Sequence, residues 1–193
     1  MNLEQLQEYT SKCHEAAKLN GWHEQTRTET EIILLIKSEM FEAFEAYRKQ
    51  KYARTSLEKA KFESICNNFD YKNVFEIYVK DKFEDELADT AIRIFDAAGK
   101  FEQPLSEVKQ STIENLAKSK HISNDNKFMG FFNEFDTFST SVKDMGIRGH
   151  NLSFLLALVL EICKRNEVDL IKHIELKLKY NSLRGHRHGG KIL

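Results

Sequence analysis

Hydrophobic residues recur at intervals of three and four along most of the chain, the spacing that gathers them on one face of an α-helix. The first such segment ends at Asn20-Gly21 and the third at Ala98-Gly99, and glycine is a common residue just after a helix. The pattern therefore predicts an all-α fold. The predicted helices cover residues 3–19, 28–50, 81–98, about 105–120, 128–145, 152–163 and 168–182.

Two stretches interrupt this pattern. Residues 51–80 carry hydrophobic side chains at irregular spacing, which we interpret as an inserted helical excursion with a turn around Asn67-Asn68, and residues 121–126 form a polar loop. No internal repeat or linker divides the chain. We expect a single all-α domain over residues 1–193, with residues 184–193 as a basic tail.

Composition narrows the possible functions. The 193 residues include 29 Lys and Arg against 30 Asp and Glu, so the basic excess of a nucleic-acid-binding protein is missing. The longest apolar run, Leu152–Leu160, is about half the length that a bilayer requires. The first residues lack the pattern of a signal peptide, and Cys13, Cys66 and Cys163 lack disulfide or zinc-site spacing. We expect a soluble cytoplasmic protein with reduced thiols and no membrane or nucleic-acid partner.

Two carboxylate pairs stand out within predicted helices. Glu39 and Glu42 lie in the second helix, and Glu86 and Asp89 lie in the third. Residues three apart project to the same side of a helix, so two neighbouring helices would direct four carboxylates to one place. Such a cluster repels itself unless a hard cation such as Mg²⁺ neutralises it. The spacing therefore indicates a magnesium site.

Glu39 has the strongest individual signal because it falls within the apolar stripe of its helix, where an unpaired acid costs several kcal/mol. Glu45 falls on the outer face and needs no partner. Lys82 and Arg93 each lie four residues from an acid of the second pair, and we interpret them as ordinary helix-surface ion pairs with Glu86 and Asp89.

These motifs resemble a known family. The strings Ser38-Glu39-Met40-Phe41-Glu42 and Glu86-Leu87-Ala88-Asp89 resemble the ExxE and ExxD signature of the MazG-like, all-α nucleoside triphosphate pyrophosphohydrolases. The segment from Lys177 to Arg184, followed by His188-Gly189-Gly190-Lys191, resembles the KxxYNxxR and HGK ending of many of these proteins. About forty residues separate the two pairs, more than is usual in the family, and loop closure makes such an insertion inexpensive. The inserted excursion accommodates the excess.

The resemblance implies hydrolysis of a nucleoside triphosphate, in particular a deoxynucleoside triphosphate, to the monophosphate and pyrophosphate. Mg²⁺, or Mn²⁺ in its place, would be held by the four acids and would activate a water for attack on the α-phosphorus, with Glu42 and Glu45 as candidates for positioning that water. A homodimer or homotetramer is also implied. The expected substrate contacts are Lys177, Tyr180, Asn181 and Arg184.

Other interpretations compete with this one. Di-iron bundle proteins use Glu-x-x-His motifs, and no histidine of this chain has a glutamate three residues before it. A non-enzymatic helical interaction protein with solvated acidic faces is the remaining alternative. We interpret three further groups as structural rather than catalytic, with contact to the nucleotide as the less favoured alternative. They are Trp22, the tail residues His186, Arg187, His188 and Lys191, and the phenylalanines of residues 128–138.

Overall fold

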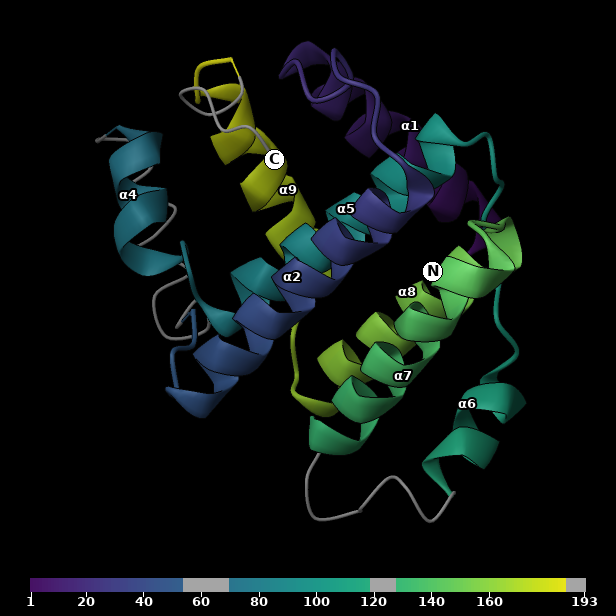
Figure 1. The fold of residues 1–193 in the computed structure, drawn as a ribbon. Coiled ribbons are helices and arrows are strands. Elements are labelled where there is room, and N and C mark those ends of the chain that lie inside the picture. The colour runs from purple at the N-terminus through teal and green to yellow at the C-terminus, as the bar shows by residue number, and fades with distance from the viewer. Residues whose placement is uncertain (54–69, 119–127, 187–193) are drawn as a thin grey trace.

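The computed structural model describes residues 1–53, 70–118 and 128–186, and all regular secondary structure within these ranges is α-helical. The prediction of an all-α fold is confirmed for this part of the chain (Figure 1). The helices are α1 (Leu3–Leu19), α2 (Glu29–Arg48), α4 (Tyr71–Tyr78), α5 (Phe83–Lys100), α6 (Gln110–Ala117), α7 (Met129–Met145), α8 (Gly149–Arg165) and α9 (Leu170–Ser182).

Local sequence signals set the limits of the first two helices. Asn2 caps the start of α1, which ends at Leu19 with Asn20 as its C-cap, and Gly21 then takes a φ of 79°. This conformation favours glycine, so the predicted stop is confirmed. At the start of α2, the Thr28 side chain accepts a hydrogen bond from the Glu31 N–H while the Glu31 carboxylate accepts one from the Thr28 N–H, which forms a capping box.

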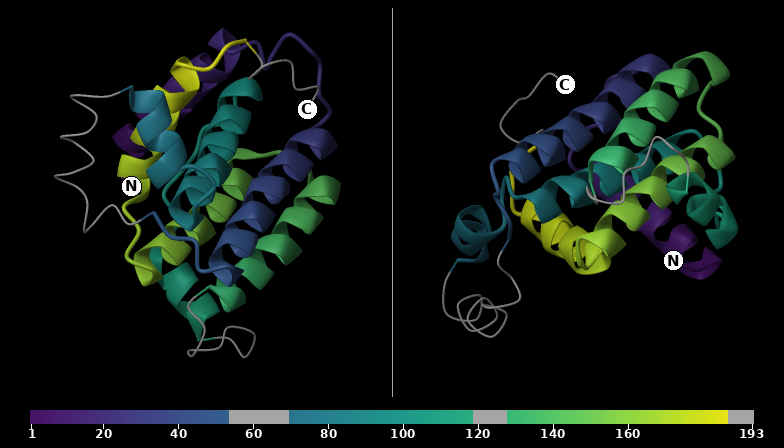
Figure 2. Two further views of the ribbon diagram at one scale, coloured as in Figure 1. Left: turned by 90° about the vertical axis from the view of Figure 1, so that its left-hand side faces the viewer. Right: turned by 90° about the horizontal axis from the view of Figure 1, so that it is seen from below.

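α5 is the central helix of the fold. It packs against α1, α2, α8 and α9, while α7 packs against both α2 and α8 (Figures 1 and 2). Eleven of its residues are buried, including Phe83, Leu87, Ala91 and Ile94. On a helix enclosed on several sides, a buried polar side chain is costly unless it finds a partner. This requirement shapes the site described below.

Two predicted features of helix ends are wrong. α5 continues through Gly99 to Lys100. A Cβ on Gly99 would lie 2.6 Å from the His14 Cβ, so this glycine permits close packing of α1 on α5 instead of ending the helix. Residues 104–109 are not helical, and the following helix begins only at Gln110. This helix ends at Ala117, about three residues before its predicted end near Lys120, and the loop predicted at 121–126 lies outside the described residues.

The described part of the excursion, residues 70–80, contains the short helix α4, which packs on α9. The turn expected at Asn67-Asn68 lies outside the described residues. Phe75 of α4 is fully buried and stacks on Tyr180, with ring centroids 4.3 Å apart. This packing forms a second, smaller hydrophobic cluster beside the main core.

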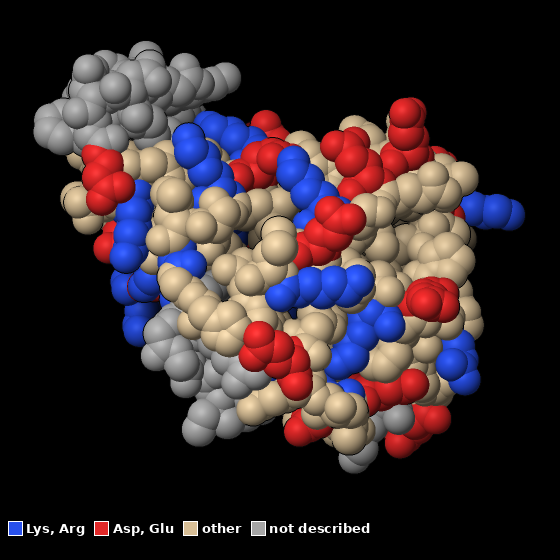
Figure 3. Space-filling view, turned by 90° about the horizontal axis from the view of Figure 1, so that it is seen from above, with Lys and Arg blue, Asp and Glu red and all other residues tan. Residues whose placement is uncertain are grey.

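The main core confirms several structural interpretations. Phe128, Phe131 and Phe135 are at most 1% exposed, so they are core residues. Cys13 and Cys163 are buried free thiols, while Cys66 lies outside the described ranges. Within those ranges, none of the helices combines the length and the hydropathy that crossing a bilayer demands. Acidic and basic side chains are intermixed on the face shown in Figure 3, as the balanced composition leads one to expect.

Candidate metal and phosphate site

The first carboxylate pair lies on α2, on the side that faces α5. The Glu39 side chain is 12% exposed and lies among the buried residues Ile36, Met40 and Ala43, as the helical wheel predicts. Glu42, one turn further along, is exposed. α2 thus presents one buried and one accessible carboxylate.

The second pair lies in the first half of α5. Glu86 is 4% exposed, and Asp89 is partly exposed. The preceding Asp85 is completely buried, and its Oδ2 accepts hydrogen bonds from the Asp81 N–H at 3.1 Å and from Lys177 Nζ at 2.9 Å. Asp81 has a φ of 58°, a left-handed conformation that turns the chain from α4 into α5 and aims its N–H at Asp85.

Three of the four predicted carboxylates converge. One oxygen each of Glu39, Glu42 and Glu86 lies within 4.8 Å of the other two, a separation at which the three could bind one cation. An all-oxygen donor set of this kind suits Mg²⁺ or Mn²⁺. Asp89 is close by but is engaged differently, because its Oδ2 lies 2.6 Å from Lys177 Nζ.

These carboxylates line a cavity of about 370 Å³ that also contains cationic and amide side chains. Three of the four predicted substrate contacts, Lys177, Asn181 and Arg184, line this cavity from α9 and the residue stretch after it. The cavity therefore joins an acidic wall to a wall of phosphate-binding residue types. The complete lining is Trp22, Glu39, Glu42, Lys80, Asp81, Glu86, Asp89, Arg93, Lys177, Asn181 and Arg184.

Burial and mutual repulsion perturb the acids. Burial, with a further contribution from the charge of Asp89, raises the pKa of Glu86 to about 9. Burial and Asp89 also raise the pKa of Glu39, although Arg93 opposes the change. Burial raises the pKa of Asp85 to about 7 despite the adjacent Lys177. A bound divalent cation would favour the ionised form of Glu39 and Glu86, so the donor set fits such an ion.

Lys177 is the internal counter-charge of this site. It is 6% exposed, and it bridges Asp85 and Asp89. Burial alone would lower the pKa of its ammonium group, but the two neighbouring carboxylates reverse that effect and raise it. Lys177 therefore stays charged, with its side chain already neutralising two acids of α5.

Tyr180, the fourth predicted substrate contact, lies elsewhere. Its ring is 2% exposed and is stacked on Phe75, its hydroxyl donates to Glu76 Oε1 at 2.9 Å, and it is not among the residues that line the cavity. The Arg184 guanidinium lies over the same ring, 5.3 Å from its centroid. The tyrosine thus anchors α4 to α9 and supports Arg184.

Arg93 has a different partner from the one predicted. Its guanidinium pairs with Glu39 of α2 at 2.9 Å, not with Asp89 one turn earlier, and it lines the cavity. Lys80 and Asp81 also line it and were missed, because only their place in the turn before α5 brings them there. Glu45 is held at the surface by Arg48 and Lys49 at 2.8 and 2.7 Å, which leaves Glu42 as the accessible candidate for positioning a water.

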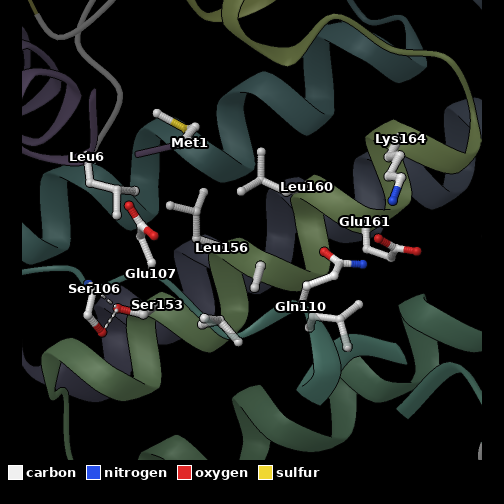
Figure 4. Close-up of a pocket in the computed structure, with 13 residues that line it drawn as sticks. Met1, Leu6, Ser106, Glu107, Gln110, Ser153, Leu156, Leu160, Glu161 and Lys164 are labelled. Atoms are coloured by element: carbon white, nitrogen blue, oxygen red, sulfur yellow. Dashed lines mark hydrogen bonds between the residues drawn. The ribbon is translucent and has the colours of Figure 1, made fainter. Parts of the chain in front are cut away.

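Two of the remaining candidates, His186 and Trp22, lie within the described residues. His186 contacts Glu24 at 2.7 Å, and Arg187, His188 and Lys191 lie outside the described residues. Trp22 does line the cavity, so stacking on a base remains open to it. A second cavity of about 330 Å³ lies between α1, α6 and α8, and its charged lining residues are Glu107, Glu161 and Lys164 (Figure 4). It has no cluster of converging carboxylates among the residues described.

Comparisons of the whole chain with protein-family models, with curated proteins and with solved structures find no match.

Proposed function

We propose that this protein is a Mg²⁺-dependent nucleoside triphosphate pyrophosphohydrolase of the MazG-like, all-α type, with a deoxynucleoside triphosphate as its expected substrate. The observation that carries the proposal is the convergence of Glu39, Glu42 and Glu86 in one cavity with Lys177 and Arg184. Acids that bind a metal beside cations that bind phosphate match the requirements of phosphoryl transfer.

The residues have distinct roles in this proposal. Glu39, Glu42 and Glu86 would hold the metal, which supplies charge neutralisation at the phosphates and an acidified water. Arg184 is the accessible bidentate phosphate donor, and Asn181 has a buried Oδ1 without a partner in the described chain, which is available to a sugar hydroxyl or a base amino group. Asp89 is the fourth acid of the set.

Lys177 links the two groups of residues. In the described structure its Nζ forms an ion pair with Asp89 Oδ2 at 2.6 Å. Asp89 can therefore coordinate the metal only if this ion pair is loosened or shared. Substrate phosphates offer the ammonium group an alternative partner, which would release Asp89 toward the metal. Substrate and metal binding are therefore expected to strengthen each other.

The same ion pairs favour a second candidate, a non-enzymatic helical interaction protein. Glu39 and Asp89 already have basic partners in Arg93 and Lys177, as acids in a purely structural network would. Glu42 and Glu86 argue against it, because neither forms an ion pair with a basic side chain among the described residues and Glu86 is almost wholly buried. An unpaired buried acid is costly, and metal binding is a common reason for keeping one.

Pyrophosphate release from a panel of canonical and modified nucleoside triphosphates tests the proposal. With Mg²⁺ present we expect turnover by the parent protein and a loss of at least 100-fold in Glu86→Gln, while the exposed acid variant Glu114→Gln on α6 retains activity. Absence of pyrophosphate release across the panel, or equal rates in the parent and Glu86→Gln, would refute it. A cytoplasmic location and a homodimeric or homotetrameric state belong to the same proposal, and light scattering tests the latter.

A further inference from the structure

A second group of metal-binding side chains lies outside the carboxylate cavity. His14 comes from α1, His23 from the segment between α1 and α2, and Asp96 from the second half of α5. His14 Nδ1 lies 2.9 Å and His23 Nε2 lies 2.7 Å from the same atom, Asp96 Oδ1. The three ligand atoms lie within 4.8 Å of one another.

The donor set is that of a borderline transition metal. Two imidazole nitrogens and one carboxylate oxygen are typical ligands of Zn²⁺, and ligand bonds of about 2.0–2.2 Å place tetrahedral donors roughly 3.3 Å apart. The two nitrogen-to-oxygen distances are shorter than this by less than 1 Å, so small side-chain rotations would open the group around an ion. The rings already meet edge to face, with centroids 4.8 Å apart.

The surroundings hold the three groups in place while leaving access. The side chains of His14, His23 and Asp96 are 15–17% exposed, so a water or an external ligand can reach a fourth coordination position. Gly99 lies against His14, and its missing side chain lets α1 approach α5 at this point. The ligands therefore come from elements whose separation is fixed by packing.

The group is a separate centre from the carboxylate cavity. Asp89 and Asp96 are seven residues apart on α5, which corresponds to about 10 Å along the helix axis. This is far beyond the reach of one ion, although both residues project from a similar side of the helix. The link between the two places is Trp22, which lines the cavity and directly precedes His23.

Hydrogen bonding alone offers a simpler explanation. Asp96 Oδ1 would then accept from both imidazoles, which requires each ring to carry its proton on the nitrogen that faces this one oxygen. Coordination requires the opposite tautomer, with the proton of each ring on its other nitrogen, so that the two nitrogens and the oxygen all direct lone pairs at the same ion. We propose that His14, His23 and Asp96 form a binding site for a zinc-class divalent transition metal, independent of the carboxylate cavity.

A metal bound here would connect three parts of the chain. It would tie α1 and the segment carrying Trp22 to α5, and so fix one wall of the carboxylate cavity. Binding of an ion to the folded state alone stabilises it, and the effect grows with the logarithm of the free ion concentration. The site is thus a structural clamp with an open coordination position.

Zinc titration of the metal-free chain in millimolar Mg²⁺ tests this site, because Mg²⁺ saturates the carboxylates without competing for imidazole. Isothermal titration calorimetry of the parent protein should give one Zn²⁺ per chain. His23→Ala should bind it at least 100-fold more weakly, and His14→Asn and Asp96→Asn should also lose it. His150→Ala, which changes an exposed histidine on α8, should leave binding unchanged.

Two further measurements exclude other sources of binding. Co²⁺ substituted for Zn²⁺ should give a visible absorption band that His23→Ala lacks, and Glu86→Gln should retain the band. A variant with His186 and His188 replaced by alanine should still bind one Zn²⁺. The proposal is overturned if the parent binds no Zn²⁺, or if the parent and a folded His23→Ala variant bind it equally. His23 lies in a turn and not in a helix, so its replacement should leave the helix content unchanged, and circular dichroism can verify that this variant folds.

Discussion

Glu86→Gln should stabilise the metal-free protein at neutral and alkaline pH, because the native state holds this acid in a place that disfavours its charge. The side chain is 4% exposed, and its pKa is raised from 4.5 to about 9. Glutamine has nearly the same shape and no charge in either state. The substitution therefore removes the electrostatic cost while it preserves the packing.

The sign and size of the effect follow from proton linkage. Below pH 4.5 Glu86 is protonated in both the folded and the unfolded chain, so it imposes no cost. Between pH 4.5 and 9 the unfolded chain releases the proton and the folded chain retains it, which lowers the free energy of unfolding by about 1.4 kcal/mol per pH unit. At pH 7 the accumulated cost is about 3 kcal/mol, and above pH 9 it no longer grows.

Urea denaturation in EDTA at pH 5, 6, 7, 8 and 9 measures the difference in unfolding free energy between Glu86→Gln and the parent. We expect this difference to be small at pH 5 and to increase with pH in favour of the variant, since contributions from other groups such as Glu39 largely cancel. Glu114→Gln, on an exposed face of α6, should show no such trend. A pH-independent difference, or a variant less stable than the parent at pH 8, would refute the reasoning. Saturating Mg²⁺ should reverse the order, because only the parent gains the stabilisation of metal binding.

Three further perturbations test other parts of the fold. Lys177→Met should destabilise the chain by about 3–5 kcal/mol in urea denaturation, because it leaves two acids of α5 without their counter-charge, and a smaller loss would mean that the ion pairs are weak. Gly99→Ala should cost about 1–3 kcal/mol, since the added Cβ meets the His14 side chain. Gly185→Ala, with no atom of the described residues within 4 Å of the added Cβ, should be neutral, and equal melting temperatures of the two variants would contradict this packing. Burial lowers the pKa of His173 from 6.5 to about 4, so the stability that its neutral form contributes is complete above pH 6.5 and is lost as the pH falls toward 4. His173→Leu should lessen the fall in unfolding free energy over that interval, and an unchanged acid limb would show that His173 is not the group that titrates.

The helical periodicity predicted most of the elements because each depends on residues close in sequence. The limits of α1, α7 and α9 agree with prediction to within about two residues, as is usual for helix ends. The sequence did not reveal the role of Gly99, because a glycine can serve a helix end or a close helix contact, and only the position of His14 decides between them. The residues after Pro104 kept a helical pattern of side chains without forming a helix before Gln110.

The acids of the site could be predicted for a similar reason, and their partners could not. Glu39 falls in an apolar stripe whose burial is implied by sequence spacing alone, and the structure buries it. Arg93, by contrast, has a possible acid one turn away in its own helix, and only the packing of α2 on α5 shows that Glu39 is its partner. Tyr180 occupies a motif position, but the motif does not indicate which neighbouring helix packs on it. In the structure Phe75 of α4 covers its ring.

The charged side chains of α5 explain why both proposed centres lie along one helix. Buried among α1, α2, α8 and α9, this helix carries Glu86, Asp89, Arg93 and Asp96 within a narrow arc of its surface. Asp89 meets Lys177, Arg93 meets Glu39, and Asp96 meets two histidines, so each finds a partner on a different element. Glu86 is the exception, since none of the ion pairs between described residues includes it. Its raised pKa reflects the free-energy cost of ionising this buried acid. A position that apolar residues could fill more stably therefore holds an acid, which is the pattern expected where function, not stability, selects the side chain.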